Sequence, residues 1–414
     1  MSQLFTGTSA KSLWTFPGDF VSRKLWSLES KELCAEARCR TGLEDFGDPA
    51  IERRLSILVK SIESEANLHP MGRFLARMHL RELLETRLLL ADAWSKSEAL
   101  DAEAIERPIF ITGMPRSGST FLHELLVQDT GSRAPLVWEV MFPLTDPAAG
   151  TRETNRRIRK TAAYLWWFRR MTPGADSFHP MRATTPHECV AIHSYTLLTQ
   201  EFATIFHVPS YEAFLNAADF SPVYAWQKRF LQHLQMRRPA KRWVLKAPDH
   251  VFNLEALFGA FPDAVIIQLH RNPLDVLKSS SQLTEVLRRT FARSQDKDQI
   301  GERETLVLAE GMDRIARFRD SHPALASRFL DINFDELVAD PLGIVHQCYR
   351  HLDFPLTDAT IERARNLASH RSRYAHRRIG PTLADHGIDS ETAARRFKNY
   401  CARFGIECLQ AESA

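Results

Sequence analysis

The chain has 414 residues, of which 44% are hydrophobic and 25% are charged, values that are usual for a globular protein. Its formal net charge of +3 is too small to indicate nucleic-acid binding, and no apolar run approaches the ~20 residues that a transmembrane segment needs. The first 30 residues contain charges but no apolar signal-peptide core, and six cysteines without C-x-x-C spacing predict reduced thiols in a cytoplasmic protein.

Residues 1–106 are predicted to form a helical region that precedes the main domain, residues 107–414. Little periodic pattern is present before residue 47. Asp48 and Pro49 then suit the N-cap and first position of a helix. Two apolar stripes at helical spacing follow: Ile51, Leu55, Leu58 and Ile62, and then Leu80, Leu84, Leu88 and Ala91. We interpret this region as a helical hairpin that packs on the main domain and has no chemistry of its own.

The most informative stretch begins at Arg107. Residues 109–112 are apolar and β-branched, which predicts a buried strand. Residues 113–118 have turn chemistry, with a glycine at each end, and a helical pattern starts at Ser119. A strand, a glycine-bounded loop and a helix N-terminus together form an anion-binding cradle, because free backbone N–H groups and the helix dipole point at the bound group.

The spacing of this loop is close to that of an ATP-binding P-loop, G-x-x-x-x-G-K-[ST]. Gly113, Gly118 and Thr120 fit this pattern, but Ser119 occupies the lysine position. A positive side chain comes earlier instead, as Arg116. The loop is therefore predicted to hold an anion without the lysine that contacts the β- and γ-phosphates in kinases.

Two further segments follow the predicted helix. Residues 135–139, which end at Glu139, are interpreted as a second short strand. Residues 151–171 are rich in arginine and lysine and then contain an aromatic run. This segment suits a lid helix over an anionic donor or a helix on a membrane surface, but we favour a solvated basic face with a buried aromatic stripe.

Histidines are scattered through residues 176–207. None of them forms an H-x-x-x-H or H-E-x-x-H pair, so we expect no metal site.

Alternating strands and helices continue toward the C-terminus. Strands are predicted at 242–246, 264–269 and 327–333, and a helix at 254–261. Asn272–Pro273 and Asp340–Pro341 are helix starts. This βαβα order predicts an α/β fold with a central parallel sheet, right-handed crossovers and flanking helices.

Two of these motifs resemble those of sulfotransferases that use 3′-phosphoadenosine 5′-phosphosulfate (PAPS). Residues 115–120, Pro-Arg-Ser-Gly-Ser-Thr, are similar to the 5′-phosphosulfate loop of that family. A strand-end arginine followed by a serine eight residues later is similar to its 3′-phosphate site. The resemblance runs from about 107 to 355. It implies a P-loop-like fold and a donor site formed by Arg116, Ser117, Gly118, Ser119, Thr120, Phe121, Arg271 and Ser279.

The resemblance also implies roles in catalysis. Lys246 matches a lysine beside the bridging oxygen of the donor, where it would stabilise the leaving phosphate. No metal is implied, because arginine and lysine can cover that phosphate. A hydroxyl acceptor needs a base, and three candidates remain open. Glu139 is the first because it follows a predicted strand, His250 is the second, and Glu188 is the third. The stretch around Glu188 is similar to a segment that borders the acceptor pocket in bacterial members.

The sequence therefore predicts transfer of a sulfuryl group from PAPS to a hydroxyl, or less readily an amine, of a small-molecule, sugar or lipid acceptor. A P-loop-type nucleotide kinase and a non-catalytic nucleotide-binding protein of the same fold are the alternatives. The acceptor and the oligomeric state stay open. The basic segment 370–378 is a candidate cover for the nucleotide, and five aromatic residues are either pocket or core: Trp138, Phe142, Trp166, Trp167 and Phe202.

Overall fold

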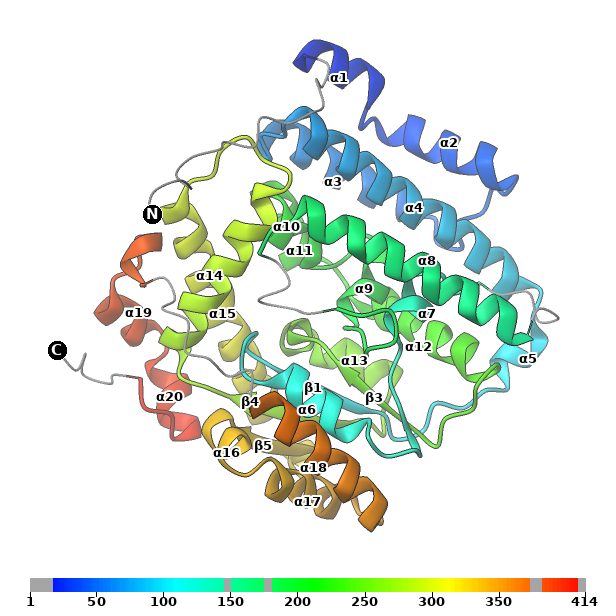
Figure 1. The fold of residues 1–414 in the computed structure, drawn as a ribbon. Coiled ribbons are helices and arrows are strands. Elements are labelled where there is room, and N and C mark those ends of the chain that lie inside the picture. The colour runs from blue at the N-terminus through cyan, green and yellow to red at the C-terminus, as the bar shows by residue number, and fades with distance from the viewer. Residues whose placement is uncertain (1–17, 145–149, 175–180, 373–381, 409–414) are drawn as a thin grey trace, which may run out of the picture.

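A five-stranded parallel sheet forms the centre of the molecule in a computed structural model, which describes residues 18–144, 150–174, 181–372 and 382–408 (Figure 1). The strand order is β2-β3-β1-β4-β5. The strands are β1 (Ile109–Gly113), β2 (Ser132–Arg133), β3 (Arg242–Lys246), β4 (Val265–His270) and β5 (Phe329–Asn333). The predicted α/β fold with a central parallel sheet is confirmed.

Strand β1 lies between β3 and β4, with Ile109 aligned with Val244 and with Val265. Because strand side chains alternate between the two faces, the odd-numbered isoleucines of β1 join one apolar cluster, and Phe110 joins the other. Both faces are buried, which explains why residues 109–111 of β1 are all apolar rather than alternating with polar ones.

One face of the sheet is covered by four helices. They are α6 (Ser119–Leu126), α16 (Phe334–Ala339), α17 (Pro341–Leu352) and α18 (Asp358–Ser372). Three of them, α16, α17 and α18, lie at the bottom of Figure 1. The predicted start at Asp340–Pro341 is confirmed, since the Asp340 carboxylate accepts a hydrogen bond from the Gly343 N–H at 2.8 Å.

The other face is covered by the remaining helices of the main domain. The longest are α8 (Gly150–Met171), α12 (Ser221–Gln235), α14 (Pro273–Arg289) and α15 (Lys297–Ser321). The shorter α-helices are α7 (Val137–Met141), α9 (Val190–His193), α10 (Glu201–Ile205), α11 (Pro209–Ala217), α13 (Leu254–Ala260), α19 (Ser390–Arg396) and α20 (Lys398–Phe404). Short 3₁₀ turns are η3 (Ser194–Thr196), η4 (Pro248–Phe252), η5 (Pro323–Arg328) and η6 (Ala384–His386).

The N-terminal helices share the core of the main domain. They are α1 (Asp19–Leu25), α2 (Ser30–Thr41), α3 (Ile51–Glu65), α4 (Pro70–Ser95) and α5 (Glu98–Asp101). The two helices with the predicted apolar stripes are present as α3 and α4, whereas α1 and α2 lie in the stretch where we saw little pattern. A single apolar cluster runs from these helices to the sheet, and includes Leu84 of α4 and Phe110 of β1.

The strand predicted at residues 135–139 is wrong. Residues 137–141 form helix α7, and the second strand, β2, comes earlier and has only two residues. Glu139 explains the difference, because its carboxylate accepts the N–H of Leu136 at 3.0 Å and caps the helix from its third position.

Cys401 and Cys408 form a disulfide, with their Cα atoms 6.2 Å apart. The expectation of reduced thiols is therefore wrong for this pair, whereas Cys34, Cys39 and Cys189 are free, as is Cys348. Among the helices in the described residues, none combines the length and the apolar character needed to cross a membrane.

Candidate active site at the carboxyl edge of the sheet

The loop between β1 and α6 depends on two glycines. Gly113 has a φ of 129°, and a Cβ there would lie 2.3 Å from the backbone oxygen of Leu269 on the neighbouring strand. Gly118 has a φ of 87°, and its Cβ would meet Leu337 at 3.0 Å. A side chain at either position would both strain the backbone and press on a neighbour. The loop thus needs glycine where the anion-cradle motif has it.

The residues between the glycines hold the loop in shape. The Ser117 hydroxyl is buried and donates to the Met114 carbonyl at 2.6 Å. Arg116 has a positive φ of 62°, an uncommon backbone conformation for a residue with a side chain. Ser119 is buried at the start of α6. Phe121 packs against the apolar cluster between the sheet and helices α6, α16, α17 and α18.

The structure brings the two motifs together. Arg116 Nε donates to Ser279 Oγ at 2.9 Å, and Arg271 Nη1 donates to the Arg116 carbonyl at 2.6 Å. Arg271 follows β4, and Ser279 lies on α14, whose N-cap at Asn272 is confirmed. We call residues 113–120 the phosphate loop, after the motif that they resemble. The expectation that Arg271 lies within reach of this loop is confirmed, while its role in binding stays a prediction.

The contact between Arg116 and Arg271 concentrates positive charge. Burial, and then the nearby Arg271, lower the pKa of Arg116 from its ordinary value. Burial is also the main cause that lowers the pKa of Arg271, whose guanidinium lies 4.0 Å from the centre of the Phe334 ring. Two neighbouring, partly desolvated cations are destabilised by each other, so a bound anion would be favourable here.

Lys246 connects the phosphate loop to the carboxylate of Glu188. It is the last residue of β3 and is 2% exposed. Its ammonium donates to Thr120 Oγ1 at 3.2 Å and pairs with the Glu188 carboxylate. The position of Lys246 at a strand end is as predicted, and its partner Glu188 was the third candidate for the base.

The backbone around Glu188 explains why it reaches Lys246. The N–H of Cys189 donates to the Lys246 carbonyl at 2.8 Å, and the N–H of His187 donates to the Pro135 carbonyl at 2.8 Å. The segment is thus held between the end of β3 and the residues before α7. The Glu188 side chain is 20% exposed and lines the cavity described below.

The first two candidates for the base lie elsewhere. Glu139 is 3% exposed, and Arg133 Nη2 donates to its carboxylate at 2.8 Å. The strand-end position on which its prediction depended is wrong. His250 is fully buried beside Tyr224, whose hydroxyl lies 2.9 Å from Nδ1, and burial lowers the pKa of the imidazole well below its ordinary value. Neither residue lines the cavity.

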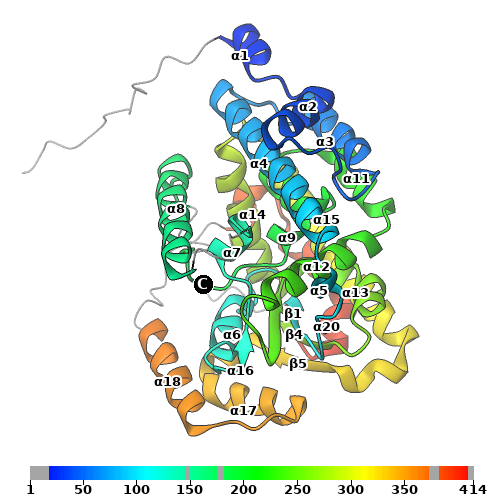
Figure 2. The same ribbon diagram turned by 90° about the vertical axis from the view of Figure 1, so that its right-hand side faces the viewer.

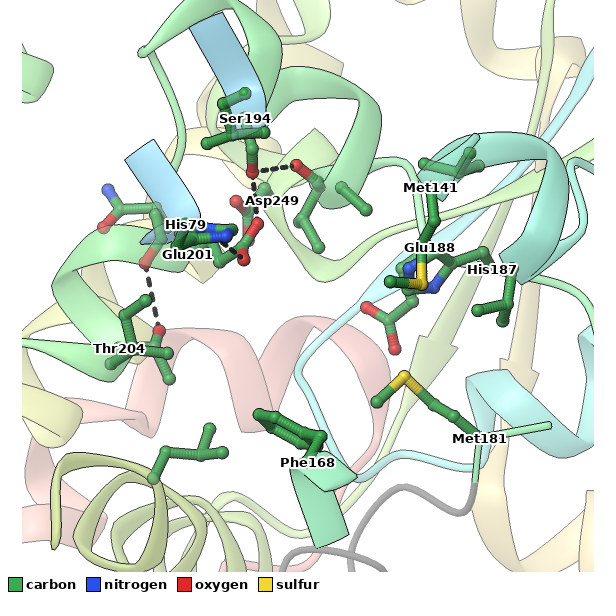
Figure 3. Close-up of a pocket in the computed structure, with 18 of the residues that line it drawn as sticks. His79, Met141, Phe168, Met181, His187, Glu188, Ser194, Glu201, Thr204 and Asp249 are labelled. Carbon is green, nitrogen blue, oxygen red and sulfur yellow. Dashed lines mark hydrogen bonds and ion pairs between the residues drawn. The ribbon is translucent and has the colours of Figure 1, made fainter. Parts of the chain in front are cut away.

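A cavity of about 940 Å³ begins at the phosphate loop and at Glu188 (Figure 3). This volume is near the upper end of the usual range for small-molecule sites. Figure 3 shows Met141, Met181 and His187 around the Glu188 carboxylate, with Phe168 facing them. Helices α4, α8, α14 and α15 also line the cavity, and they contribute charged as well as apolar side chains.

Farther along the cavity, Figure 3 shows a polar group from several elements. The Ser194 hydroxyl donates to the Glu201 carboxylate, whose other oxygen is 3.6 Å from His79 Nε2 on α4. Asp249 lies on the same wall. Burial, and then the nearby Glu188, raise the pKa of Asp249 to about 7. The cavity thus combines apolar side chains with many charged and polar ones, so it suits a ligand that has both apolar and polar parts.

The contribution of α4 was missed by the sequence analysis, which assigned no chemistry to residues 1–106. Leu75, Met78 and Leu83 of this helix line the cavity. Helix α8 forms another wall with its aromatic face, so the favoured interpretation of that face as simply buried is incomplete.

The five aromatic residues that were candidates for the pocket or the core lie in different surroundings. Phe142 and Trp167 line the cavity, Phe202 is core, and Trp166 is 63% exposed. Trp138 lies against the guanidinium of the buried Arg157. The proposed nucleotide cover at 370–378 lies almost entirely outside the described residues.

Comparison with known proteins agrees with this geometry. The model of a family described as "Sulfotransferase family" matches residues 108–358. A curated protein of Mycobacterium bovis, named omega-hydroxy-beta-dihydromenaquinone-9 sulfotransferase Stf3, is 27% identical over 296 residues, which are 69% of this chain and 72% of that protein. Among solved structures, the sulfotransferase STF1 of Mycobacterium tuberculosis is 32% identical with a TM-score of 0.78, and the alignment covers 89% of this chain and 98% of STF1. The sulfotransferase STF9 of Mycobacterium avium is 27% identical with a TM-score of 0.81, and the alignment covers 91% of this chain and 97% of STF9.

Proposed function

Because this chain belongs to the sulfotransferase family, we propose that it transfers a sulfuryl group from PAPS to the hydroxyl of an apolar alcohol. The observation that carries this proposal is the position of Lys246, which contacts Thr120 of the phosphate loop on one side and Glu188 of the cavity on the other. A donor held by the loop and an acceptor held in the cavity would meet at this lysine.

The residues of the loop fit a donor with two phosphate groups. The N–H groups of residues 116–120 and the N-terminus of α6 suit the 5′-phosphosulfate. The Arg271 guanidinium and the Ser279 hydroxyl suit the 3′-phosphate, because both are donors and lie on one side of the loop. Arg116 lies between the two groups and would be freed from Ser279 to contact either phosphate. The buried cations at this place support a strongly anionic ligand.

Glu188 is the base in this proposal, in place of Glu139. In the reaction, the acceptor oxygen forms a bond to sulfur, the bond from sulfur to the phosphate oxygen breaks, and the acceptor proton passes to the Glu188 carboxylate. Lys246 stabilises the negative charge that develops on the phosphate oxygen. The backbone holds Lys246 and Glu188 together, because the N–H of Cys189, the residue after Glu188, donates a hydrogen bond to the Lys246 carbonyl. The ammonium and the carboxylate are therefore oriented before the acceptor enters.

The walls of the cavity support an apolar acceptor over a sugar. A sugar needs hydrogen bonds along its whole length, whereas Met141, Met181 and Phe168 lie around the Glu188 carboxylate (Figure 3). The name of the Mycobacterium bovis relative gives a hydroxylated menaquinone as its acceptor, which is also an apolar alcohol. A bulky residue on α4 tests this assignment: Met78→Trp should raise the KM for the acceptor several-fold and leave donor affinity unchanged.

Transfer of ³⁵S from labelled PAPS to a panel of long-chain, prenyl, sterol and sugar alcohols tests the function. We expect label on at least one apolar alcohol. Calorimetry with adenosine 3′,5′-bisphosphate and with ATP separates the alternatives, because a kinase would bind ATP in preference. Binding of the bisphosphate without turnover of any acceptor would favour a non-catalytic nucleotide-binding protein.

A further inference from the structure

Helix α8 has two faces with different surroundings. Its inner face is fixed to the molecule by Arg157, Thr161 and Leu165, which are all buried, and its aromatic side chains line the cavity. Figure 2 shows α8 on the left side of the molecule, above α18, with no labelled helix drawn to its left at the same height. The opposite face is therefore directed to the surroundings of the protein.

This outer face has a regular composition. Its residues follow one another at intervals of four and three, which places them on a single stripe of the helix, and all are exposed. They are Arg152, Arg156, Arg159, Ala163, Trp166 and Arg170, and Arg156 among them also borders the cavity. We refer to these six residues as the outer face of α8.

The charges of the outer face are largely uncompensated. Arg156 pairs with Glu153 at 2.7 Å, and that glutamate is the only acidic residue of the helix. Within the described parts of the chain, Arg152, Arg159 and Arg170 have no carboxylate partner. A surface with this excess of arginine attracts anionic groups.

Trp166 is what distinguishes this face from an ordinary solvated one. With 63% of its surface exposed, it is the most exposed of the large apolar side chains in the described residues. An indole among arginines is poorly placed in water. At a membrane surface, in contrast, its ring sits among the lipid headgroups while the arginines contact lipid phosphates. The stripe of arginine and tryptophan fits that environment on both counts.

We propose that the outer face of α8 docks the protein on an anionic lipid surface. The helix then lies along the bilayer, and its inner face separates the lipid from the cavity by the width of one helix. An apolar alcohol dissolved in the membrane would need to cross only this distance. The docking itself depends on charge and on Trp166, and it does not require that the proposed transfer reaction is correct.

Vesicle flotation with the full chain, without donor or acceptor, tests the proposal. We expect binding to vesicles of phosphatidylglycerol and phosphatidylcholine in equal parts, little binding to pure phosphatidylcholine, and weaker binding as salt is raised. Each arginine near such a surface contributes about fivefold in affinity, so Arg159→Gln and Arg170→Gln together should weaken binding about 25-fold. Trp166→Ser should weaken it several-fold even at low salt.

Matched controls come from exposed residues on other helices. Arg395→Gln removes a charge whose side chain is 69% exposed on α19, and Val338→Ser removes an apolar side chain that is 57% exposed on α16. Neither should change vesicle binding. All variants should unfold at the wild-type temperature, and all should retain normal activity on a water-soluble acceptor if one is found.

Three results would overturn the proposal. The first is equal binding to both kinds of vesicle, or binding that the outer-face variants leave unchanged. The second is self-association of the free chain, seen by light scattering and abolished by Trp166→Ser, which would make this face an interface between two copies. The third is tighter binding to an RNA than to anionic vesicles at the same salt concentration.

Discussion

Two glutamates allow base catalysis to be separated from structural pairing. Glu188 and Glu139 each place a carboxylate against a buried cation, Lys246 and Arg133 respectively. Replacement of either by glutamine keeps the size and one acceptor oxygen but removes the charge. Because the two substitutions are chemically equivalent, any difference in turnover between them reflects the position of the carboxylate.

The cost in stability can be worked out from the contacts. Glu139→Gln weakens a charge-assisted hydrogen bond, which contributes about 1.5–3 kcal/mol, although Arg133 keeps its bond to the Leu234 carbonyl at 2.9 Å. We therefore expect a loss near 2 kcal/mol. For a chain of 414 residues that unfolds as one unit, the entropy of unfolding is about 0.9 kcal/mol per kelvin, so Tm should fall by about 2 °C. Glu188→Gln should cost less, because its side chain is 20% exposed rather than 4%.

The effect on turnover should be very different. Glu188→Gln removes the proton acceptor and should lower kcat by roughly 10²–10⁴, whereas Glu139→Gln should leave kcat close to that of the wild type. Initial rates of ³⁵S transfer at saturating PAPS and acceptor measure this. A nitrophenol, if accepted, should shrink the loss, because its hydroxyl ionises without help. If Glu188→Gln retains activity while Glu139→Gln is inactive, the reasoning from the cavity is refuted and the original first candidate is the base.

Three further predictions concern the donor site and its surroundings. Arg271→Ala should weaken binding of adenosine 3′,5′-bisphosphate by roughly 10–150-fold in calorimetry, since a contact to a charged group contributes about 1.5–3 kcal/mol. Replacement of the exposed Arg289 by alanine should not weaken it. Equal affinities of the two variants would remove Arg271 from the site. Gly118→Ala should lower Tm and donor affinity, whereas Gly259→Ala, where a Cβ meets nothing within 4 Å, should do neither; a normal Gly118→Ala variant would show that the loop tolerates a side chain. The pKa of Asp249 is raised to about 7 in the folded state, so the folded chain binds the proton more tightly than the unfolded one and stability falls as pH rises from about 4 to about 7. Asp249→Asn should therefore raise Tm at pH 8 but not at pH 4, and the same Tm shift at both pH values would contradict this.

The parts of the site that depend on local chemistry could be predicted from the sequence. Gly113 and Gly118 are required by the backbone at those positions, and the apolar strand before them can only be buried. The helix start at Asn272 was equally clear, because an N-cap side chain followed by proline is a local signal. The strand order then brought Arg271 to the loop, as parallel sheets do at their carboxyl edge.

The parts that depend on side-chain direction could not be predicted. Glu139 was placed by four apolar residues before it, a run too short to separate a strand from a helical turn. His250 is close to Lys246 in sequence, but the 3₁₀ turn η4 directs it to Tyr224 in the core. The stripe on α4 marks the buried side of that helix without showing that residues such as Met78 border a cavity, since a cavity is formed by several distant elements together.

The wall contributed by α4 has a consequence for how specificity diverges among these enzymes. The family signature begins at residue 108, yet one side of the cavity is made by residues 70–95, upstream of it. Mutations in that helix can reshape the proposed acceptor cavity while the loop, Lys246 and the sheet remain under unchanged selection. Two chains with identical donor motifs can therefore diverge in acceptor by drift in a segment that the family signature does not contain. Acceptor inference within this group should be based on the N-terminal helices as well as on the signature.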